Sequence, residues 1–195
     1  MTDASVLHHV ALAESGKVLA LRGDHIGALE KYREAMNSTL AAKAPEVFFR
    51  HYLEAALESL EMMRDFDSVL QYCDKAIQHY AARPPAHELA TLDLASVHQR
   101  RAVMLLKLGR IADAQAALAE ALAIAVQVNA NLELSKVLSG WLARGLTVTP
   151  ERLLAEQRRL RYFSVRADTL RSTPANATAE CNSTIAAEIA AERVA

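Results

Sequence analysis

Residues 19–36 read LALRGDHIGALEKYREAM, and two later stretches repeat this pattern: LEMMRDFDSVLQYCDKAI at 60–77 and LLKLGRIADAQAALAEAL at 105–122. Each stretch contains the end of an apolar helix, a short polar turn and the start of a second helix with small residues at matching places. Two helices joined by a short turn pack as an antiparallel hairpin. The three stretches therefore predict an all-α chain built from an array of helical hairpins.

The composition supports an all-helical protein. Apolar residues make up 52% of the 195 residues and aromatic residues only 5%, and the excess consists of Ala and Leu, which are strong helix formers. Only six glycines and five prolines interrupt the chain, so few positions break a helix. A chain of this length is expected to form one domain with a sizeable core.

Charge and cysteine content restrict the classes of function. The net charge is −1, so no overall positive field attracts a phosphate backbone, and we expect no binding to nucleic acid. The two cysteines, Cys73 and Cys181, are not expected to pair. The sequence has no signal-peptide pattern and no run of about 18 apolar residues. We therefore expect a cytoplasmic protein that does not associate with a membrane.

The first stretch, together with Gly16 shortly before it, shows the most complete repeat pattern. Gly16, Gly23, Ala28 and Ala35 are small residues at places where two helices and the next hairpin approach closely, and the aromatic Tyr32 fills the gap between them. This pattern of small and large residues resembles the tetratricopeptide repeat. The matching alanines of successive stretches lie 41 and 45 residues apart, against 34 for the common repeat. Such long units resemble those of bacterial regulatory proteins.

The resemblance implies a right-handed superhelix of about three hairpin units. In that family the first helix of each unit lines a concave groove, which binds a peptide or helix of a partner protein. We divide the chain into a repeat domain at 1–145, a capping or dimerisation helix within 146–171, and a mobile, polar and Ala-rich tail at 172–195.

The predicted groove is acidic in its middle. When the first helix of each unit is projected inward, the lining residues are Lys17, Leu21, His51, Glu54, Glu58, Glu61, Gln99, Val103 and Lys107. The three glutamates disfavour an anionic ligand such as a terminal carboxylate, and favour a peptide with basic or apolar side chains. The alternative interpretation is that these glutamates form only the solvated face of an amphipathic helix.

The segment that follows Thr149 begins as a helix should. Thr149 is a suitable N-cap, Pro150 suits the first position and Glu151 suits the first turn, and we expect this helix to continue to Arg171. Its basic and aromatic residues suit a cap on the last hairpin, a dimer contact or a surface for an acidic partner. These residues are Arg158, Arg159, Arg161, Tyr162, Phe163 and Arg166.

The sequence contains no catalytic or metal-binding motif that we recognise. Its seven histidines form no metal-ligand pattern, and it has neither a Gly-rich phosphate loop nor a nucleophile motif. We predict no enzyme activity, no metal and no cofactor. The predicted function is a non-enzymatic interaction module, an adaptor or scaffold. The alternatives are a signal-responsive regulator, which binds a peptide or small ligand and controls an effector, and a self-associating structural oligomer such as a homodimer.

Overall fold

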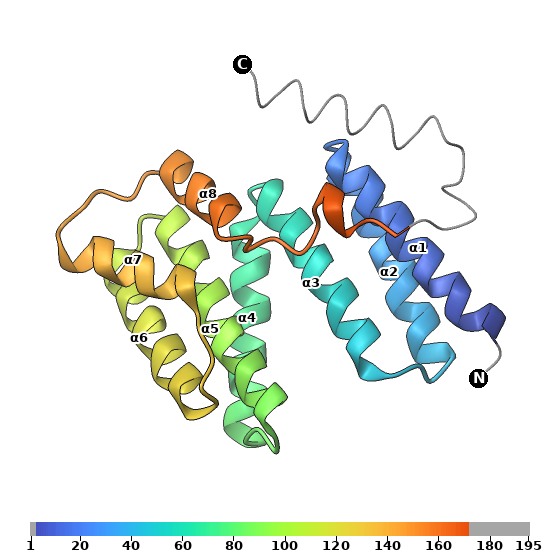
Figure 1. Ribbon diagram of the computed structural model, residues 1–195, viewed down its shortest axis with the longest axis horizontal. Helices are drawn as coiled ribbons and strands as arrows, with labels where there is room; N and C mark the ends of the chain where they lie inside the picture. Colours follow the sequence, from blue (N-terminus) through green and yellow to red (C-terminus); the bar gives the residue numbers. More distant parts are fainter. Residues whose placement is uncertain (1–2, 172–195) are drawn as a thin grey trace. The chain divides into compact units, whose positions relative to one another are not determined.

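The computed structural model describes residues 3–171, and this part of the chain is all-helical, as predicted (Figure 1). Its elements are α1 (Asp3–Leu21), α2 (His25–Ala41), α3 (Glu46–Met62), α4 (Phe66–Ala82), α5 (Glu88–Lys107), α6 (Ile111–Gln127), α7 (Glu133–Ala143), α8 (Pro150–Arg159) and the 3-10 helix η1 (Ala167–Thr169). The predicted tail at 172–195 lies outside the described residues. Among the helices that are described, none is long and apolar enough to cross a membrane.

The chain divides into two compact units. Of the described residues, unit 1 contains α1, α2 and α3 together with residues 163–171, and unit 2 runs from Arg64 to Tyr162. The first boundary falls in the turn of the second predicted hairpin, between Met63 and Arg64. The expected boundary at residue 145 does not coincide with this division.

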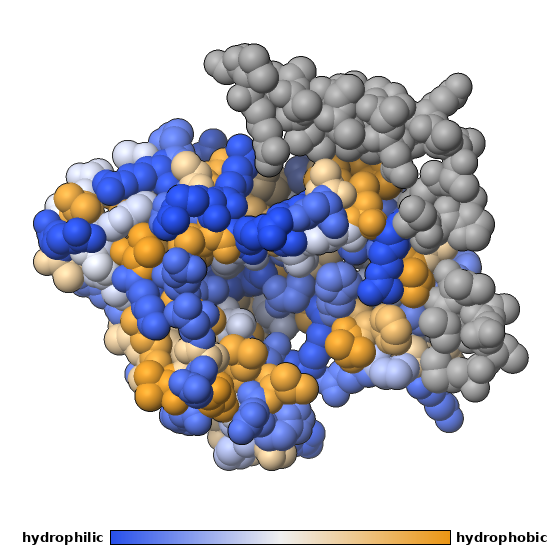
Figure 2. Space-filling view, viewed as in Figure 1, coloured by the Kyte–Doolittle hydropathy of each residue, from blue (hydrophilic) through white to orange (hydrophobic). Residues whose placement is uncertain are grey.

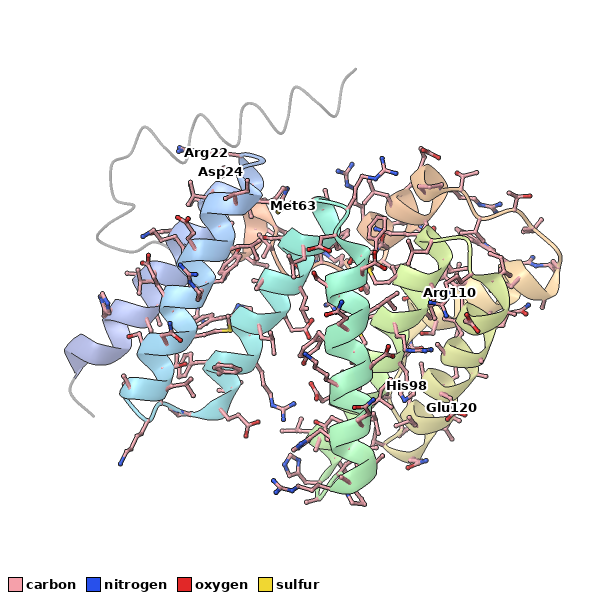
Figure 3. All side chains as sticks on the ribbon, turned by 180° about the vertical axis from the view of Figure 1, so that it is seen from behind. Arg22, Asp24, Met63, His98, Arg110 and Glu120 are labelled. Atoms are coloured by element: carbon pink, nitrogen blue, oxygen red, sulfur yellow. The ribbon has the colours of Figure 1, made fainter. Side chains whose placement is uncertain are left out.

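The three repeated turns share one backbone conformation. Gly23, Arg64 and Gly109 all have positive φ, at 83°, 65° and 72°. Glycine adopts this left-handed region without steric cost, whereas Arg64 has a Cβ that is crowded there. Asp24, at the α1–α2 turn (Figure 3), caps α2 by accepting a hydrogen bond from the backbone N–H of Gly27. The repeated pattern therefore marks real helix ends.

In unit 1 the small residues of the first stretch let α1 and α2 pack closely. The fully buried ring of Tyr32 lies directly against Gly16, where an added Cβ would be 2.6 Å from the ring carbon Cε1. Ala28 and Ala35 are also fully buried. The alternation of small and large residues in the sequence thus corresponds to an actual contact between helices.

In unit 2 the long helix α5 packs against both α4 and α6, and α6 also packs against α7. Three successive residues of α5, Val103, Met104 and Leu105, are fully buried. Leu118 and Ala121 of α6 are buried as well. At the polar edge of the α5–α6 pair, His98 lies near Glu120 (Figure 3). The core of unit 2 is therefore centred on α5.

The last helix is shorter than predicted. Its start agrees with the sequence, because Thr149 accepts a hydrogen bond from the N–H of Arg152 and Pro150 is the first helical residue. However, α8 ends at Arg159, and Arg161 has a positive φ of 55°. The expectation of a helix to Arg171 is wrong, because the backbone N–H groups of Ser164, Val165 and Arg171 bind side chains instead of helical carbonyl groups.

The visible surface of the described residues is mixed in character. In the space-filling view, hydrophobic residues lie in small groups between polar ones (Figure 2). Individual exposed apolar side chains such as Leu89 and Val126 are ordinary on a folded protein. The buried polar groups of the described residues, rather than this surface, form the candidate site.

Candidate functional site

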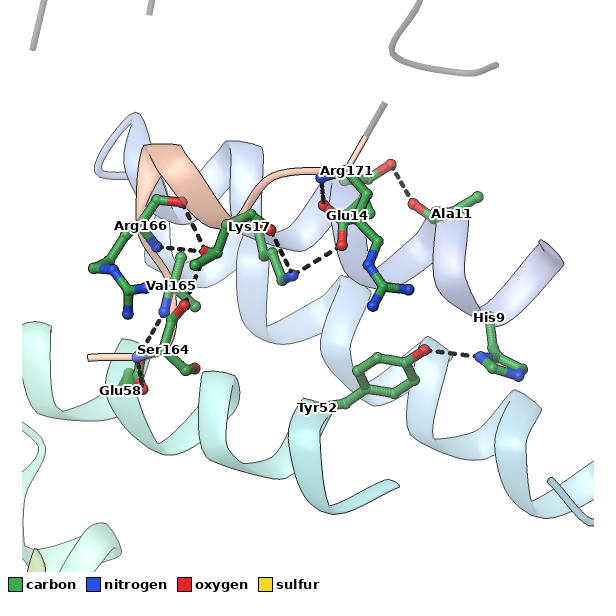
Figure 4. A network of polar contacts seen from close by, with 12 residues as sticks. His9, Ala11, Glu14, Lys17, Tyr52, Glu58, Ser164, Val165, Arg166 and Arg171 are labelled. Atoms are coloured by element: carbon green, nitrogen blue, oxygen red, sulfur yellow. Dashed lines mark hydrogen bonds and ion pairs between the residues drawn. The ribbon is translucent and has the colours of Figure 1, made fainter. Parts of the chain in front are cut away.

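After α8 the chain returns to unit 1 and lies across α1 and α3 (Figures 1 and 4). We call residues 163–171 the strap, and the surface of α1 and α3 beneath it the strap-binding face. Apart from the short turn η1, the strap is not helical. Arg166 and Leu170, which flank η1, both have extended backbone angles.

A buried carboxylate holds the first part of the strap. Glu58 of α3 is only 4% exposed. Its Oε1 accepts a hydrogen bond from the backbone N–H of Ser164 at 2.6 Å, and its Oε2 accepts one from the N–H of Val165 at 3.0 Å (Figure 4). Hydrogen bonds to an ionised group are short and about twice as strong as neutral ones. Glu58 therefore fixes the backbone of two consecutive residues, whatever their side chains are.

The side chain of Val165 fills a space beside this carboxylate. It packs against the buried cluster that contains Tyr32 of α2 together with Ala55 and Ala56 of α3. The small alanine side chains of this cluster allow a branched apolar side chain to pack close to it. Val165 is thus an apolar anchor next to a polar backbone contact.

An ion pair on α1 holds the last part of the strap. Glu14 and Lys17 are both buried, and the distance from Lys17 Nζ to Glu14 Oε1 is 2.8 Å. The second oxygen of Glu14 accepts the N–H of Arg171 at 2.8 Å, and Lys17 also donates to the carbonyl oxygen of Thr169 at 3.3 Å. A buried ion pair needs further hydrogen bonds to offset its lost hydration, and the strap backbone supplies them.

Between these two contacts, the strap is held in shape by its own residues. The Thr169 hydroxyl accepts the backbone N–H of Arg166 at 3.0 Å and lies 2.9 Å from the carbonyl oxygen of Ser164. The Arg166 guanidinium donates to the carbonyl oxygen of Phe163 at 2.6 Å and to Asp168 at 3.0 Å. The strap is therefore a compact loop that meets the face at its two ends.

A separate buried hydrogen bond joins α1 and α3 farther from the strap. The Tyr52 hydroxyl and Nδ1 of His9 share a hydrogen bond of 2.8 Å (Figure 4), and the Phe48 ring lies 4.9 Å from the His9 ring, centroid to centroid. Burial raises the pKa of Tyr52 to about 12, so its hydroxyl keeps its proton. Burial, and next the nearby His8, lower the pKa of His9, which favours its neutral form.

Six of the nine predicted groove residues lie in unit 1. Lys17 and Glu58 hold the strap, Leu21 and Glu54 are half-buried, and Glu61 is buried. His51 is exposed.

The remaining three predicted groove residues lie in unit 2 and make contacts within it. The carbonyl oxygen of the Gln99 side chain accepts hydrogen bonds from the N–H and hydroxyl of Ser135. Lys107 lies 5.5 Å from the centre of the Phe66 ring. The projection placed Val103 on a groove, but its side chain is fully buried within unit 2 because α5 is covered on several sides.

The second predicted surface does not form one helix face, since α8 ends before most of it. Arg158, Arg159 and Arg161 are exposed in unit 2. Tyr162 lies 5.4 Å below the guanidinium of Arg100 in the same unit. The other two members, Phe163 and Arg166, belong to the strap.

Sequence analysis missed several residues that build the site, namely Glu14, Ser164, Val165, Thr169 and Arg171. Only Glu14 had a usable signal, because it stands one helical turn before Lys17 on the same face. The strap residues contribute mainly backbone groups. Because nearly every residue has the same backbone groups, the sequence does not indicate which of them form the site.

Within residues 3–171, no three His, Cys, Asp or Glu side chains gather as a metal ion would require. Comparisons of the whole chain with models of protein families, with curated proteins and with solved structures give no match. The candidate site is accordingly defined by its own geometry.

Proposed function

We propose that this protein is a non-enzymatic interaction module, an adaptor or scaffold of the tetratricopeptide type. In this proposal the protein acts in the cytoplasm and its helical hairpins continue as a right-handed superhelix. The strap-binding face of unit 1 binds a non-helical segment of a partner protein. The observation that supports this most directly is that Glu58 binds two consecutive backbone N–H groups.

The chemistry of the strap-binding face suits a peptide. Glu58 and Glu14 accept backbone N–H groups, Lys17 donates to a backbone carbonyl group, and Ala55 and Ala56 leave room for one apolar side chain. Main-chain contacts give affinity and a side-chain pocket gives selectivity, which is how other proteins recognise extended segments. The packing of Val165 against the apolar cluster also agrees with a partner that has apolar side chains.

The proposal is tested by capturing partners from the source cells with wild-type protein and with Glu58→Lys. Glu30→Lys is the matched control, because Glu30 is an exposed glutamate on α2 of the same unit. We expect at least one partner to bind wild type and Glu30→Lys but not Glu58→Lys. Since a buried lysine can unfold unit 1, Glu58→Gln is measured alongside, and circular dichroism verifies the helix content. A partner set that is the same for all folded variants would refute the assignment of the face.

A further inference from the structure

We propose that the strap is a built-in competitor for the ligand of the strap-binding face. On this view, a partner segment binds by making the strap's contacts, and it binds only when the strap leaves. The inference rests on the proposed function and specifies the ligand chemistry of the same site.

The contacts of the strap define what a ligand must present. Glu58 requires two consecutive backbone N–H groups, so neither of those positions can be proline. The second of the two should have a small branched apolar side chain, as Val165 has, to pack against the cluster that contains Tyr32, Ala55 and Ala56. Four residues after this anchor a carbonyl oxygen meets Lys17, and six residues after it an N–H meets Glu14.

Release of the strap leaves no charged group buried without a partner or water. Glu14 and Lys17 are one turn apart on α1, so their ion pair remains when the strap is gone. Glu58 loses two N–H donors but gains access to water, which solvates a carboxylate well. Ala167, Asp168 and Arg171 of the strap are already exposed. The cost of release is therefore set mainly by the backbone contacts and by the Val165 side chain.

Covalent attachment makes the strap an effective competitor. A tethered segment acts at an effective concentration on the order of 1 mM. When the strap itself binds the face with an intrinsic Kd of about 100 μM, it weakens the observed affinity of a free peptide by a factor of roughly ten. A partner must exceed the strap in contacts or in concentration before it binds.

The test uses the full chain and a fluorescent peptide with the sequence of residues 161–171, RYFSVRADTLR. In the variant Val165→Asp the strap loses its apolar anchor and places a second negative charge beside Glu58. Ala167→Asp is the matched control, because it adds the same charge at an exposed position of the strap. Fluorescence anisotropy should show that Val165→Asp binds the peptide about tenfold more tightly than wild type or Ala167→Asp does. A peptide with the change Val165→Pro should bind at least tenfold more weakly than the unchanged peptide.

A second measurement needs no protein variant. In the ¹⁵N-labelled wild-type chain, excess unlabelled peptide should speed the hydrogen exchange of the backbone amides of Ser164, Val165 and Arg171, because it displaces the strap. Unchanged exchange at saturating peptide would show that the strap is not displaced and would overturn the inference.

The outcomes separate this inference from the proposed function. If the peptide binds Val165→Asp and wild type equally, or binds neither, the strap is not a competitor, although capture that depends on Glu58 would still support the proposed function. If the proline peptide binds as well as the unchanged one, the ligand chemistry is wrong. If light scattering shows that wild type is a dimer and Val165→Asp a monomer, a second copy occupies the face, and the assignment to a separate partner is overturned.

Discussion

The contact between Gly16 of α1 and Tyr32 of α2 gives the sharpest test of how unit 1 is packed. Replacing Gly16 with alanine adds one methyl group, and its carbon would be 2.6 Å from Cε1 and 2.8 Å from Cδ1 of the Tyr32 ring. Both are carbons of a rigid, fully buried ring, so the clash cannot be relieved by turning a flexible side chain. Either the ring or the helix must move.

Two opposing terms set the size of the effect. Forcing an extra methyl group into a close-packed core costs about 1–3 kcal/mol, whereas alanine in place of glycine within a helix gains about 1 kcal/mol. The contact is about 1 Å shorter than the optimum for two carbon atoms, which places the packing cost in the upper part of its range. We therefore expect Gly16→Ala to lower the free energy of unfolding by about 1–2 kcal/mol.

Gly140 of α7 is the matched control, because an added Cβ there meets only the Arg144 guanidinium at 3.6 Å. Gly140→Ala should raise the free energy of unfolding by about 0.5–1 kcal/mol through helix propensity alone. Both variants are compared with wild type by urea unfolding followed by circular dichroism. If Gly16→Ala were as stable as Gly140→Ala, Gly16 and Tyr32 would not be in close contact, and the packing described for α1 and α2 would be refuted.

Three further predictions concern backbone strain, a buried ion pair and a buried histidine. Arg64→Gly should raise the free energy of unfolding by about 0.5–1 kcal/mol, because glycine removes the backbone strain at φ 65°. A decrease would show that the arginine side chain stabilises the fold by more than the strain costs. Lys17→Met should lower the free energy of unfolding by about 3–5 kcal/mol, since it leaves Glu14 buried without its cation. Adding Glu14→Leu to this variant should recover most of the lost stability. A double variant as unstable as Lys17→Met alone would contradict the ion pair between Glu14 and Lys17. Because burial lowers the pKa of His9, the unfolded chain takes up a proton before the folded chain does as pH falls below about 6.5, so stability should decrease there by at most about 1.4 kcal/mol per pH unit. Urea unfolding at pH 7.5, 6.5 and 5.5 should give a smaller pH dependence for His9→Gln, and an unchanged one would assign the effect to other histidines.

The parts of the fold that were predicted correctly depend on neighbours in the sequence. Helix ends at Gly23 and Gly109 follow from a local conformational preference. The small residues around Tyr32 lie at helical spacing, so their packing follows from periodicity. The prediction of a helix to Arg171 is wrong, because the backbone N–H groups of Ser164, Val165 and Arg171 have partners more than 100 residues away in the sequence. No local sequence pattern predicts hydrogen bonds between residues so far apart in the sequence.

Glu58 shows why a site is harder to predict than a fold. In sequence it stands at helical spacing from Glu54 and Glu61, which is the pattern of a solvated face as much as of a ligand groove. The structure buries Glu58 under the strap and uses both of its oxygens. A solvated face and a binding site differ here only in whether a segment covers Glu58. The covering segment is the strap, which lies at the other end of the described chain.

The geometry at Glu58 also changes which partner residues matter. In the sequence, the charge of the three glutamates favours a partner with basic or apolar side chains. In the structure Glu58 binds backbone N–H groups, which every residue except proline has, so its charge gives affinity without choosing a side chain. The Arg166 guanidinium meanwhile binds groups of the strap itself. Selection must therefore come from the space that Val165 fills and from the exclusion of proline, and a partner segment is better sought by a branched apolar residue in a proline-free context than by its positive charge.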